Sequence, residues 1–365
     1  MIKKFKEGFE KRHELARRLK KDGKKTIGCF YGTVPKELVH AAGLVPIQLM
    51  EDQDPLYDAK SDLLPFLCGM SKNLTGQIYD KVFDYVDGVL ISTVCDTNRH
   101  VPDIWERNKV FPKTWIVRVP ATNSEVAVDY YTRELRRLAE DFANLSGRKV
   151  TEDNLRESIS LYNENRSLFR KFYEVRPASG VSAEDAVYVF SSALVLPVED
   201  HNQMLREFLA SLPPAPRADQ RTKLMLCALN INMSLNVIRM AEKFGGRVVT
   251  DDFTHNARYG SAEIETDNDV FRALARGYLR KIPVPGMYSI QQRAGYIREL
   301  MDKSGAEGLI YVIQLYCDAY AMEYAVLKEY FDKWKLPHLR IEAEDTPGSI
   351  EQLNVRVQSF LESIM

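Results

Sequence analysis

The chain has 365 residues, which is long enough for two domains with substantial hydrophobic cores. Its 50 lysine and arginine residues nearly balance 51 aspartate and glutamate residues, so no basic stripe points to nucleic-acid binding. No apolar run is long enough for a membrane span, and the charged first helix lacks the apolar core of a secretory signal. These features predict a cytoplasmic protein that binds neither nucleic acid nor membrane.

The N-terminal part predicts a charged helix over residues 3–21, followed by an α/β domain. Short apolar runs that are typical of buried parallel strands lie at 26–30, 45–50, 86–91 and 114–119. Helical patterns separate these runs at 35–42, 70–83 and 98–108. Strands that alternate with helices favour a parallel sheet that is covered on both faces.

One of these strands, 86–91, leads directly into Cys95-Asp96 and a helix. A second copy of the pattern occurs late in the chain, where the apolar run 309–315 leads into Cys317-Asp318 and another helix. Open α/β sheets bind ligands at the carboxyl ends of their strands. Two related α/β domains that face one site are therefore expected.

The middle of the chain is almost wholly helical, with predicted helices at 124–145, 151–173, 182–194 and 197–211 and a proline-rich linker at 212–216. Strand patterns then return at 222–229, 246–251, 309–315 and 339–342. Helices are expected at 232–244, 266–280, 287–303, 318–335 and 349–364. The predicted fold is α/β, with two Rossmann- or flavodoxin-like parallel-sheet domains (residues 1–122 and 217–365) joined by a helical bridge (123–216).

Five scattered cysteines, an odd number, do not form the pattern of a disulfide framework. Cys68, Cys95 and Cys317 each lie at a predicted loop-to-helix junction, where soft thiolates select zinc, copper(I) or iron–sulfur clusters. Three ligands would leave one metal position open. Their wide spacing alone favours buried or incidental cysteines instead. Cys29 and Cys227 lie inside strands and are interpreted as small buried hydrophobic residues.

Other polar residues lie near predicted strand ends. Thr33 and Glu51 offer a hydroxyl and a carboxylate for proton transfer, although loop capping is the commoner role. His100 follows Cys95 on a helix and is either a group that supports the cysteine or a surface residue. His255 and Arg258 lie in a loop after a strand, where they suit an anion. The sequence has no glycine-rich phosphate loop, so nucleotide hydrolysis by this chain is not expected.

Taken together, several motifs resemble one known family. They are Gly28-Cys29-Phe30, the segment 35–46, Cys68 at its helix entrance, Val94-Cys95-Asp96-Thr97, Val248–Asp252 with Arg258, Tyr316-Cys317-Asp318, Ile341-Glu342 and the segment 351–360. They occur in the order found in the catalytic subunits of ATP-driven benzoyl-CoA reductases and 2-hydroxyacyl-CoA dehydratases. The resemblance covers residues 24–362.

This resemblance implies a four-iron four-sulfur (4Fe-4S) cluster held by Cys68, Cys95 and Cys317, with the fourth position left to a non-cysteine ligand or to substrate. It also implies a heterodimer with a homologous catalytic subunit. A separate ATP-hydrolysing iron–sulfur activator would inject low-potential electrons. The acyl-CoA thioester would then be reduced to a ketyl-type radical.

The resemblance leaves two branches open. The segment 98–106 is more similar to aryl-CoA reductases, which implies a benzoyl-CoA reductase type of subunit that adds two electrons and two protons to the ring. The alternative is a 2-hydroxyacyl-CoA dehydratase subunit, in which Thr33 and Glu51 would act on the substrate. A non-catalytic electron-relay subunit and a cluster-free binding module with core cysteines remain as further alternatives.

Overall fold

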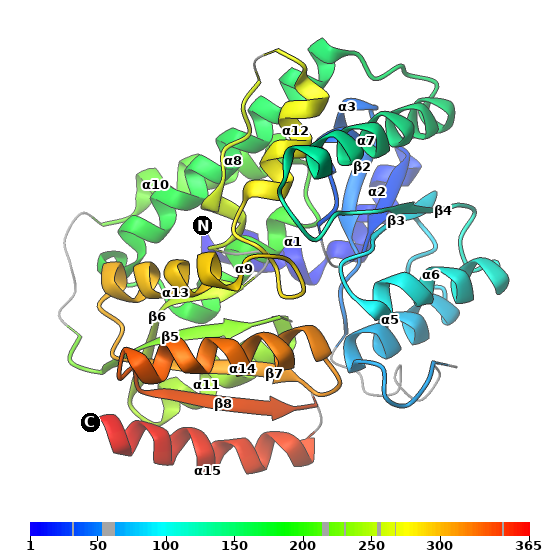
Figure 1. Ribbon diagram of the computed structural model, residues 1–365. Coiled ribbons are helices and arrows are strands. Elements are labelled where there is room, and N and C mark those ends of the chain that lie inside the picture. Colours follow the sequence, from blue (N-terminus) through cyan, green and yellow to red (C-terminus); the bar gives the residue numbers. More distant parts are fainter. Residues whose placement is uncertain are drawn as a thin grey trace.

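The computed structural model describes residues 1–30, 33–52, 63–213, 219–229, 231–253, 257–266, 268–344 and 347–365. Two parallel sheets organise the described chain, and Figure 1 shows the sheet β5–β8 below the sheet β1–β4. The N-terminal helices α1 (Ile2–Glu10) and α2 (Arg12–Lys21) precede the first sheet. The α/β architecture with two Rossmann-like sheets that the sequence predicts is confirmed.

The first sheet consists of β1 (Thr26–Cys29), β2 (Val45–Gln48), β3 (Gly88–Ser92) and β4 (Thr114–Val117). Its helices are α3 (Lys36–Ala41), α5 (Gly69–Tyr79) and α6 (Asp96–Arg107). The strand order is β2-β1-β3-β4, and all pairings are parallel. β3 is buried along its whole length because its apolar residues meet helices on both faces of the sheet.

The second sheet repeats this order with β6-β5-β7-β8, and its described pairings are also parallel. Its strands are β5 (Thr222–Ala228), β6 (Gly246–Phe253), β7 (Gly308–Gln314) and β8 (His338–Ala343). The helices that accompany them are α11 (Ile231–Lys243), α12 (Val270–Arg280), α13 (Ile290–Ser304), α14 (Asp318–Lys333) and α15 (Pro347–Ile364), with a short 3-10 turn η1 at Tyr259–Ser261. β3 and β7 thus occupy equivalent places in the two sheets.

Both sheets change direction at the equivalent place, because the chain steps from β1 across to β2 and then returns to place β3 on the other side. The second sheet does the same with β5, β6 and β7. Open α/β sheets bind their ligands at the carboxyl ends of the strands at such a switch point. Cys95 and Cys317 follow the ends of β3 and β7, so both lie at the carboxyl ends of the strands that border a switch point.

The helical middle consists of α7 (Glu125–Ser146), α8 (Glu152–Ser179), α9 (Ala183–Ala193) and α10 (Val198–Ser211). α8 packs against α3 of the first half and α12 of the second, and α9 packs against α1 and α11. Figure 1 shows α8 and α10 in green above the sheet β5–β8. This segment therefore helps to fix the position of one half against the other.

Among the predicted boundaries that differ from the structure, three change the description of an element. The helix expected over 3–21 is divided into α1 and α2, with Lys11 between them at φ −91° and ψ 18°. α8 continues through Pro177, since proline already has a helical φ, and ends at Gly180 in the left-handed conformation with φ 76°. β6 extends to Phe253, so that Asp252 pairs with Cys227 across the sheet.

A transmembrane helix must be about 20 residues long and predominantly apolar. None of the helices in the described ranges meets both conditions.

Candidate functional site

Three cysteines occupy the same structural position, the residue that precedes an α-helix. Cys68 is the N-cap of α5, Cys95 of α6 and Cys317 of α14. Helix N-termini present free backbone N–H groups and a positive dipole end, which favour an anionic sulfur. All three predicted ligands thus lie at the start of a helix that favours a thiolate.

The three thiols also lie within electrostatic reach of one another. Burial raises the pKa of Cys95 to about 11, and the nearby Cys68 adds to the shift, while backbone N–H groups of Asn98 and Thr97 oppose it. Burial likewise raises the pKa of Cys317 to about 12, with further contributions from Cys68 and Cys95. Cysteines far apart in the sequence therefore converge from both halves of the chain.

A cavity of about 60 Å³ lies between two of these cysteines. Its lining residues come from both halves of the chain and are mostly apolar: Met70, Val94, Cys95, Asn98, Leu229, Val284, Pro285, Cys317, Ala319 and Tyr320. An apolar lining excludes water, and exclusion of water strengthens every electrostatic interaction inside the cavity. This space is the candidate site that the strand-end cysteines predict.

Neighbouring polar groups hold the cysteines in place. The Asn98 amide donates to the Ser92 carbonyl at 3.0 Å, and its Oδ1 lies 3.5 Å from Cys95 Sγ. Cys68 Sγ lies 3.3 Å from the hydroxyl of Ser71, which in turn donates to the Cys68 carbonyl at 2.8 Å. These contacts fix two of the three thiols before any ligand binds.

The arrangement of the donors bears on the kind of metal centre that they suit. Within the described ranges, no group of three or more histidine, cysteine, aspartate or glutamate side chains is arranged to hold a single ion. Cysteines that ligate an iron–sulfur cluster bond to different irons, so they do not converge on one point. Three thiols at helix N-termini, two of which line an apolar cavity, suit a cluster better than a lone ion.

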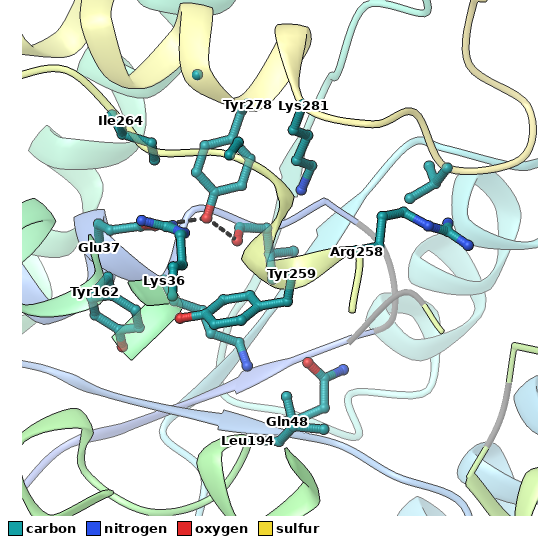
Figure 2. Close-up of a pocket in the computed structure, with 15 residues that line it drawn as sticks. Lys36, Glu37, Gln48, Tyr162, Leu194, Arg258, Tyr259, Ile264, Tyr278 and Lys281 are labelled. Carbon is teal, nitrogen blue, oxygen red and sulfur yellow. Dashed lines mark hydrogen bonds and ion pairs between the residues drawn. The ribbon is translucent and has the colours of Figure 1, made fainter. Parts of the chain in front are cut away.

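A second cavity, of about 70 Å³, shares Val284 with the cysteine cavity. It is lined from three parts of the chain: the first half, the helical middle and the segment 258–284. Figure 2 shows Lys36, Lys281 and Arg258 around it, together with several tyrosines. Its lining combines apolar side chains with the charged residues Lys36, Glu37, Arg166, Arg258 and Lys281.

A buried charge network forms one wall of this second cavity. Glu37 pairs with Arg166 and accepts a hydrogen bond of 2.6 Å from the Tyr278 hydroxyl. Burial alone would raise the pKa of Glu37, but the Arg166 guanidinium and these hydrogen bonds hold it below its usual value. Glu37 is therefore a fixed anion whose charge Arg166 balances.

Thr33, Glu51 and Arg258 are all buried in the structure. The Thr33 hydroxyl has no hydrogen-bond partner among the described residues. Glu51 accepts a hydrogen bond of 3.0 Å from the backbone N–H of Ile231, at the start of α11. Arg258 lines the second cavity and donates to Asp252 at 2.9 Å.

The two predicted histidines are placed differently. His100 lies on α6 with an exposed side chain, away from the residues that line either cavity. His255 lies outside the described residues. The structure therefore brings together the three cysteines, whereas His100 faces solvent.

Sequence reasoning did not single out most of the residues around the second cavity. Lys36 and Glu37 directly follow the loop after the first strand, a position where charged residues signal a site. Arg166 and Tyr278 carry no such signal, because they lie 129 and 241 positions from Glu37. Only the folded chain brings them together.

Comparison with known proteins places this chain in context. Residues 31–364 match the family described as "2-hydroxyglutaryl-CoA dehydratase, D-component". The chain is 31% identical over 347 residues to one of the subunits of benzoyl-CoA reductase from Thauera aromatica, covering 91% of this chain and 88% of that protein. It is 24% identical over 379 residues to the beta subunit of (R)-2-hydroxyglutaryl-CoA dehydratase of Acidaminococcus fermentans, covering 100% of this chain and 99% of that protein. It is 22% identical over 354 residues to the (R)-phenyllactyl-CoA dehydratase beta subunit of Clostridium sporogenes, covering 96% of this chain and 94% of that protein.

Proposed function

The chain belongs to the 2-hydroxyglutaryl-CoA dehydratase D-component family, and from this premise we propose that it is an iron–sulfur subunit of a low-potential acyl-CoA reductase of the benzoyl-CoA type. Its relatives are subunits of acyl-CoA reductases and dehydratases, so the chain is an oxidoreductase or lyase subunit. The observation that carries the proposal is the convergence of Cys68, Cys95 and Cys317 at three helix N-termini.

These three cysteines would hold a 4Fe-4S cluster and leave one iron without a cysteine ligand. When bound, the cluster would supply low-potential electrons and an open coordination position for the thioester carbonyl or hydroxyl of a substrate. The helix N-termini would compensate the negative charge of the thiolates. The apolar lining around Cys95 and Cys317 would exclude water from the bound acyl group.

Protons and substrate would be handled by neighbouring polar residues. The buried Thr33 hydroxyl has an unused hydrogen-bond capacity within the described chain, which suits a donor to a substrate oxygen. Glu51 would act as a carboxylate base, although its contact with Ile231 also gives it a capping role. Arg258 would bind substrate from the wall of the second cavity, and His255 is proposed to bind substrate beside it. The exposed position of His100 removes it from the proposed proton-transfer groups.

A dehydratase subunit is the second candidate function. The family description and two relatives that are dehydratase beta subunits support it. The higher identity to a benzoyl-CoA reductase subunit, 31% against 22% and 24%, favours the reductase type. An electron-relay role, in which the partner subunit alone binds substrate, is compatible with the same cysteine site.

The relatives are named as subunits, which implies that this chain also works in a complex. We propose a homologous catalytic subunit as its partner and a separate ATP-hydrolysing iron–sulfur protein as its electron donor. An acyl-CoA thioester is the proposed substrate, and the cytoplasm is the proposed location.

The two branches differ in electron stoichiometry. The complex purified anaerobically from its native cells would be given a low-potential reductant, ATP and either benzoyl-CoA or a 2-hydroxyacyl-CoA. A ring reductase consumes two electrons per product, whereas loss of water is redox-neutral and uses electrons only catalytically. Two electrons per benzoyl-CoA converted is the expected result. Turnover of 2-hydroxyacyl-CoA alone, without net electron use, would contradict the reductase proposal and support the dehydratase.

A further inference from the structure

Lys281 carries an amine that is not committed to an acidic partner. The residue directly follows α12, and Figure 2 shows its side chain beside Tyr278 at the second cavity. Within the part of the chain that the structure describes, the amine forms no ion pair and no hydrogen bond. It lies 4.6 Å from the centre of the Tyr278 ring, whose face attracts a cation but does not neutralise it.

The charged groups around Lys281 disfavour its protonated form. Three further cations line the same cavity, namely Lys36, Arg166 and Arg258. Glu37 is the sole acid among the described lining residues, and it is already paired with Arg166. An ammonium group at Lys281 therefore meets like charges without a free counter-ion, and such surroundings favour the neutral amine.

The pKa of Lys281 agrees with this environment. Burial lowers the pKa to about 7, Arg166, Arg258 and Lys36 act in the same direction, and Glu37 acts against them. About half of the molecules then carry the neutral amine at pH 7, whereas a lysine with the ordinary pKa of about 10.4 is neutral in fewer than one molecule in about 1,000. Only the neutral amine has the free electron pair that attacks a carbonyl carbon.

Lys281 is also placed where a thioester can reach it. The residue is part-exposed, so a reagent can approach it from solvent. The cavity that it lines shares Val284 with the cysteine cavity. Arg258, which is proposed to bind substrate, lines the same cavity as Lys281. The amine thus lies beside the place that is proposed for an acyl-CoA.

We propose that Lys281 is an acylation site, at which Nζ attacks the thioester carbonyl of an acyl-CoA in the second cavity. A C–N bond forms, the C–S bond breaks, and CoA leaves as a thiolate that takes up the proton released by the nitrogen. The products are an amide at Lys281 and free CoA thiol, so the step needs no oxidant, reductant or cluster. The inference rests on the proposed acyl-CoA substrate and adds a covalent modification, which would fill part of a cavity of about 70 Å³.

Two kinds of acylating agent test the site on the purified full-length chain, with peptide mapping by mass spectrometry as the readout. At pH 7, a trace of isotope-labelled acetic anhydride should label Lys281 at least about tenfold faster than Lys21, an exposed lysine on α2. The rate at Lys281 should rise from pH 6 to pH 8 and then level off, whereas the rate at Lys21 should keep rising.

Benzoyl-CoA or a 2-hydroxyacyl-CoA, incubated with the chain without reductant, should form one amide per chain at Lys281. Release of free CoA thiol should fall at least about tenfold in Lys281→Arg, because the guanidinium stays protonated and does not attack a thioester. Lys21→Arg is the matched control and should release CoA at the wild-type rate. Circular dichroism checks that both variants are folded.

The outcomes separate this inference from the proposed function. Equal labelling of Lys281 and Lys21 by the anhydride would overturn the acylation site, as would preferential labelling by the anhydride without an amide from either CoA ester. If the anaerobic complex converts its acyl-CoA while Lys281 stays unmodified, the acylation site fails and the proposed function stands. An iron-free chain that still forms the amide at Lys281 would support the acylation site and contradict the cluster alone.

Discussion

Arg293 shows how single buried charges organise the second half of the chain. Its guanidinium is fully buried and lies 2.6 Å from Asp252 and 2.8 Å from Glu323. Tyr311 donates a further hydrogen bond of 2.8 Å to Glu323. Asp252 also binds Arg258, so this cluster connects α13 and α14 to the loop that lines the second cavity.

Replacement of Arg293 by methionine should lower the free energy of unfolding by about 3–5 kcal/mol, because it leaves two buried carboxylates without their cation. Denaturant unfolding monitored by circular dichroism measures the change. Arg298→Met is the matched control on the same helix. Arg298 forms an exposed ion pair with Asp302, which contributes about 0.5 kcal/mol or less to the free energy of unfolding. Equal effects of the two variants would show that the buried cluster does not stabilise the fold.

His201 predicts a pH dependence of stability. Its Nε2 donates to the Val189 carbonyl at 3.0 Å, and its Nδ1 accepts from the Asn165 amide at 3.0 Å, so neither nitrogen has room for a second proton. Burial lowers the pKa of His201 to about 4. Below about pH 6.5 the unfolded chain binds a proton at His201, whereas the native chain binds it only near pH 4. The free energy of unfolding therefore falls as the pH is lowered from 6.5 to 4.

Thermal or denaturant unfolding at pH 7 and pH 5 checks this linkage. His201 should account for a loss of roughly 1–2 kcal/mol on acidification, and His201→Gln, whose amide can replace both hydrogen bonds, should remove that loss. His100→Gln, at an exposed position, should keep the wild-type slope. An unchanged slope in His201→Gln would contradict the assignment.

At the scale of elements, β3 begins at a close approach that only glycine tolerates. A Cβ on Gly88 would overlap the Trp115 ring and lie 2.8 Å from the Lys113 carbonyl. The two residues belong to β4 and to the turn before it, so this contact sets the spacing of β3 and β4. The position of β3 in turn fixes where Cys95 lies.

Gly88→Ala should therefore destabilise the protein by about 1–3 kcal/mol through overpacking. Gly295→Ala is the matched control inside α13, where a Cβ would have no neighbour within 4 Å. The Gly295→Ala change should instead raise the free energy of unfolding by at most about 1 kcal/mol, because alanine has a higher helix propensity than glycine. The two unfolding midpoints should move in opposite directions, and a shift in the same direction would contradict the packing account.

Most elements follow from the sequence because their signals are local. The apolar runs that end at Cys95 and Cys317 predict β3 and β7, and glycine or proline marks most helix ends. α8 is the exception, because Pro177 signals a stop whereas the chain remains helical to Gly180. Local sequence cannot decide such a case, since tertiary packing determines whether the lost hydrogen bond is tolerated.

At the scale of the whole molecule, the candidate site joins the two halves. The sequence predicts Cys95 and Cys317 at strand ends, and the equivalent strand orders of the two sheets explain why these two cysteines meet. Sequence reasoning could not find Arg166 or Tyr278 beside Glu37, because no local pattern encodes a contact between distant segments. The polar cavity is thus a product of how the helical middle packs against both halves.

The central claim is that Cys68, Cys95 and Cys317 together hold an iron–sulfur cluster. Iron and sulfide content, with a visible spectrum, of protein purified without oxygen tests it most directly. The account predicts about four irons and four sulfides per chain, lost in a folded Cys95→Ala variant and kept in Cys29→Ala, whose thiol is buried in β1. An iron-free wild-type protein, or unchanged iron in Cys95→Ala, would contradict it.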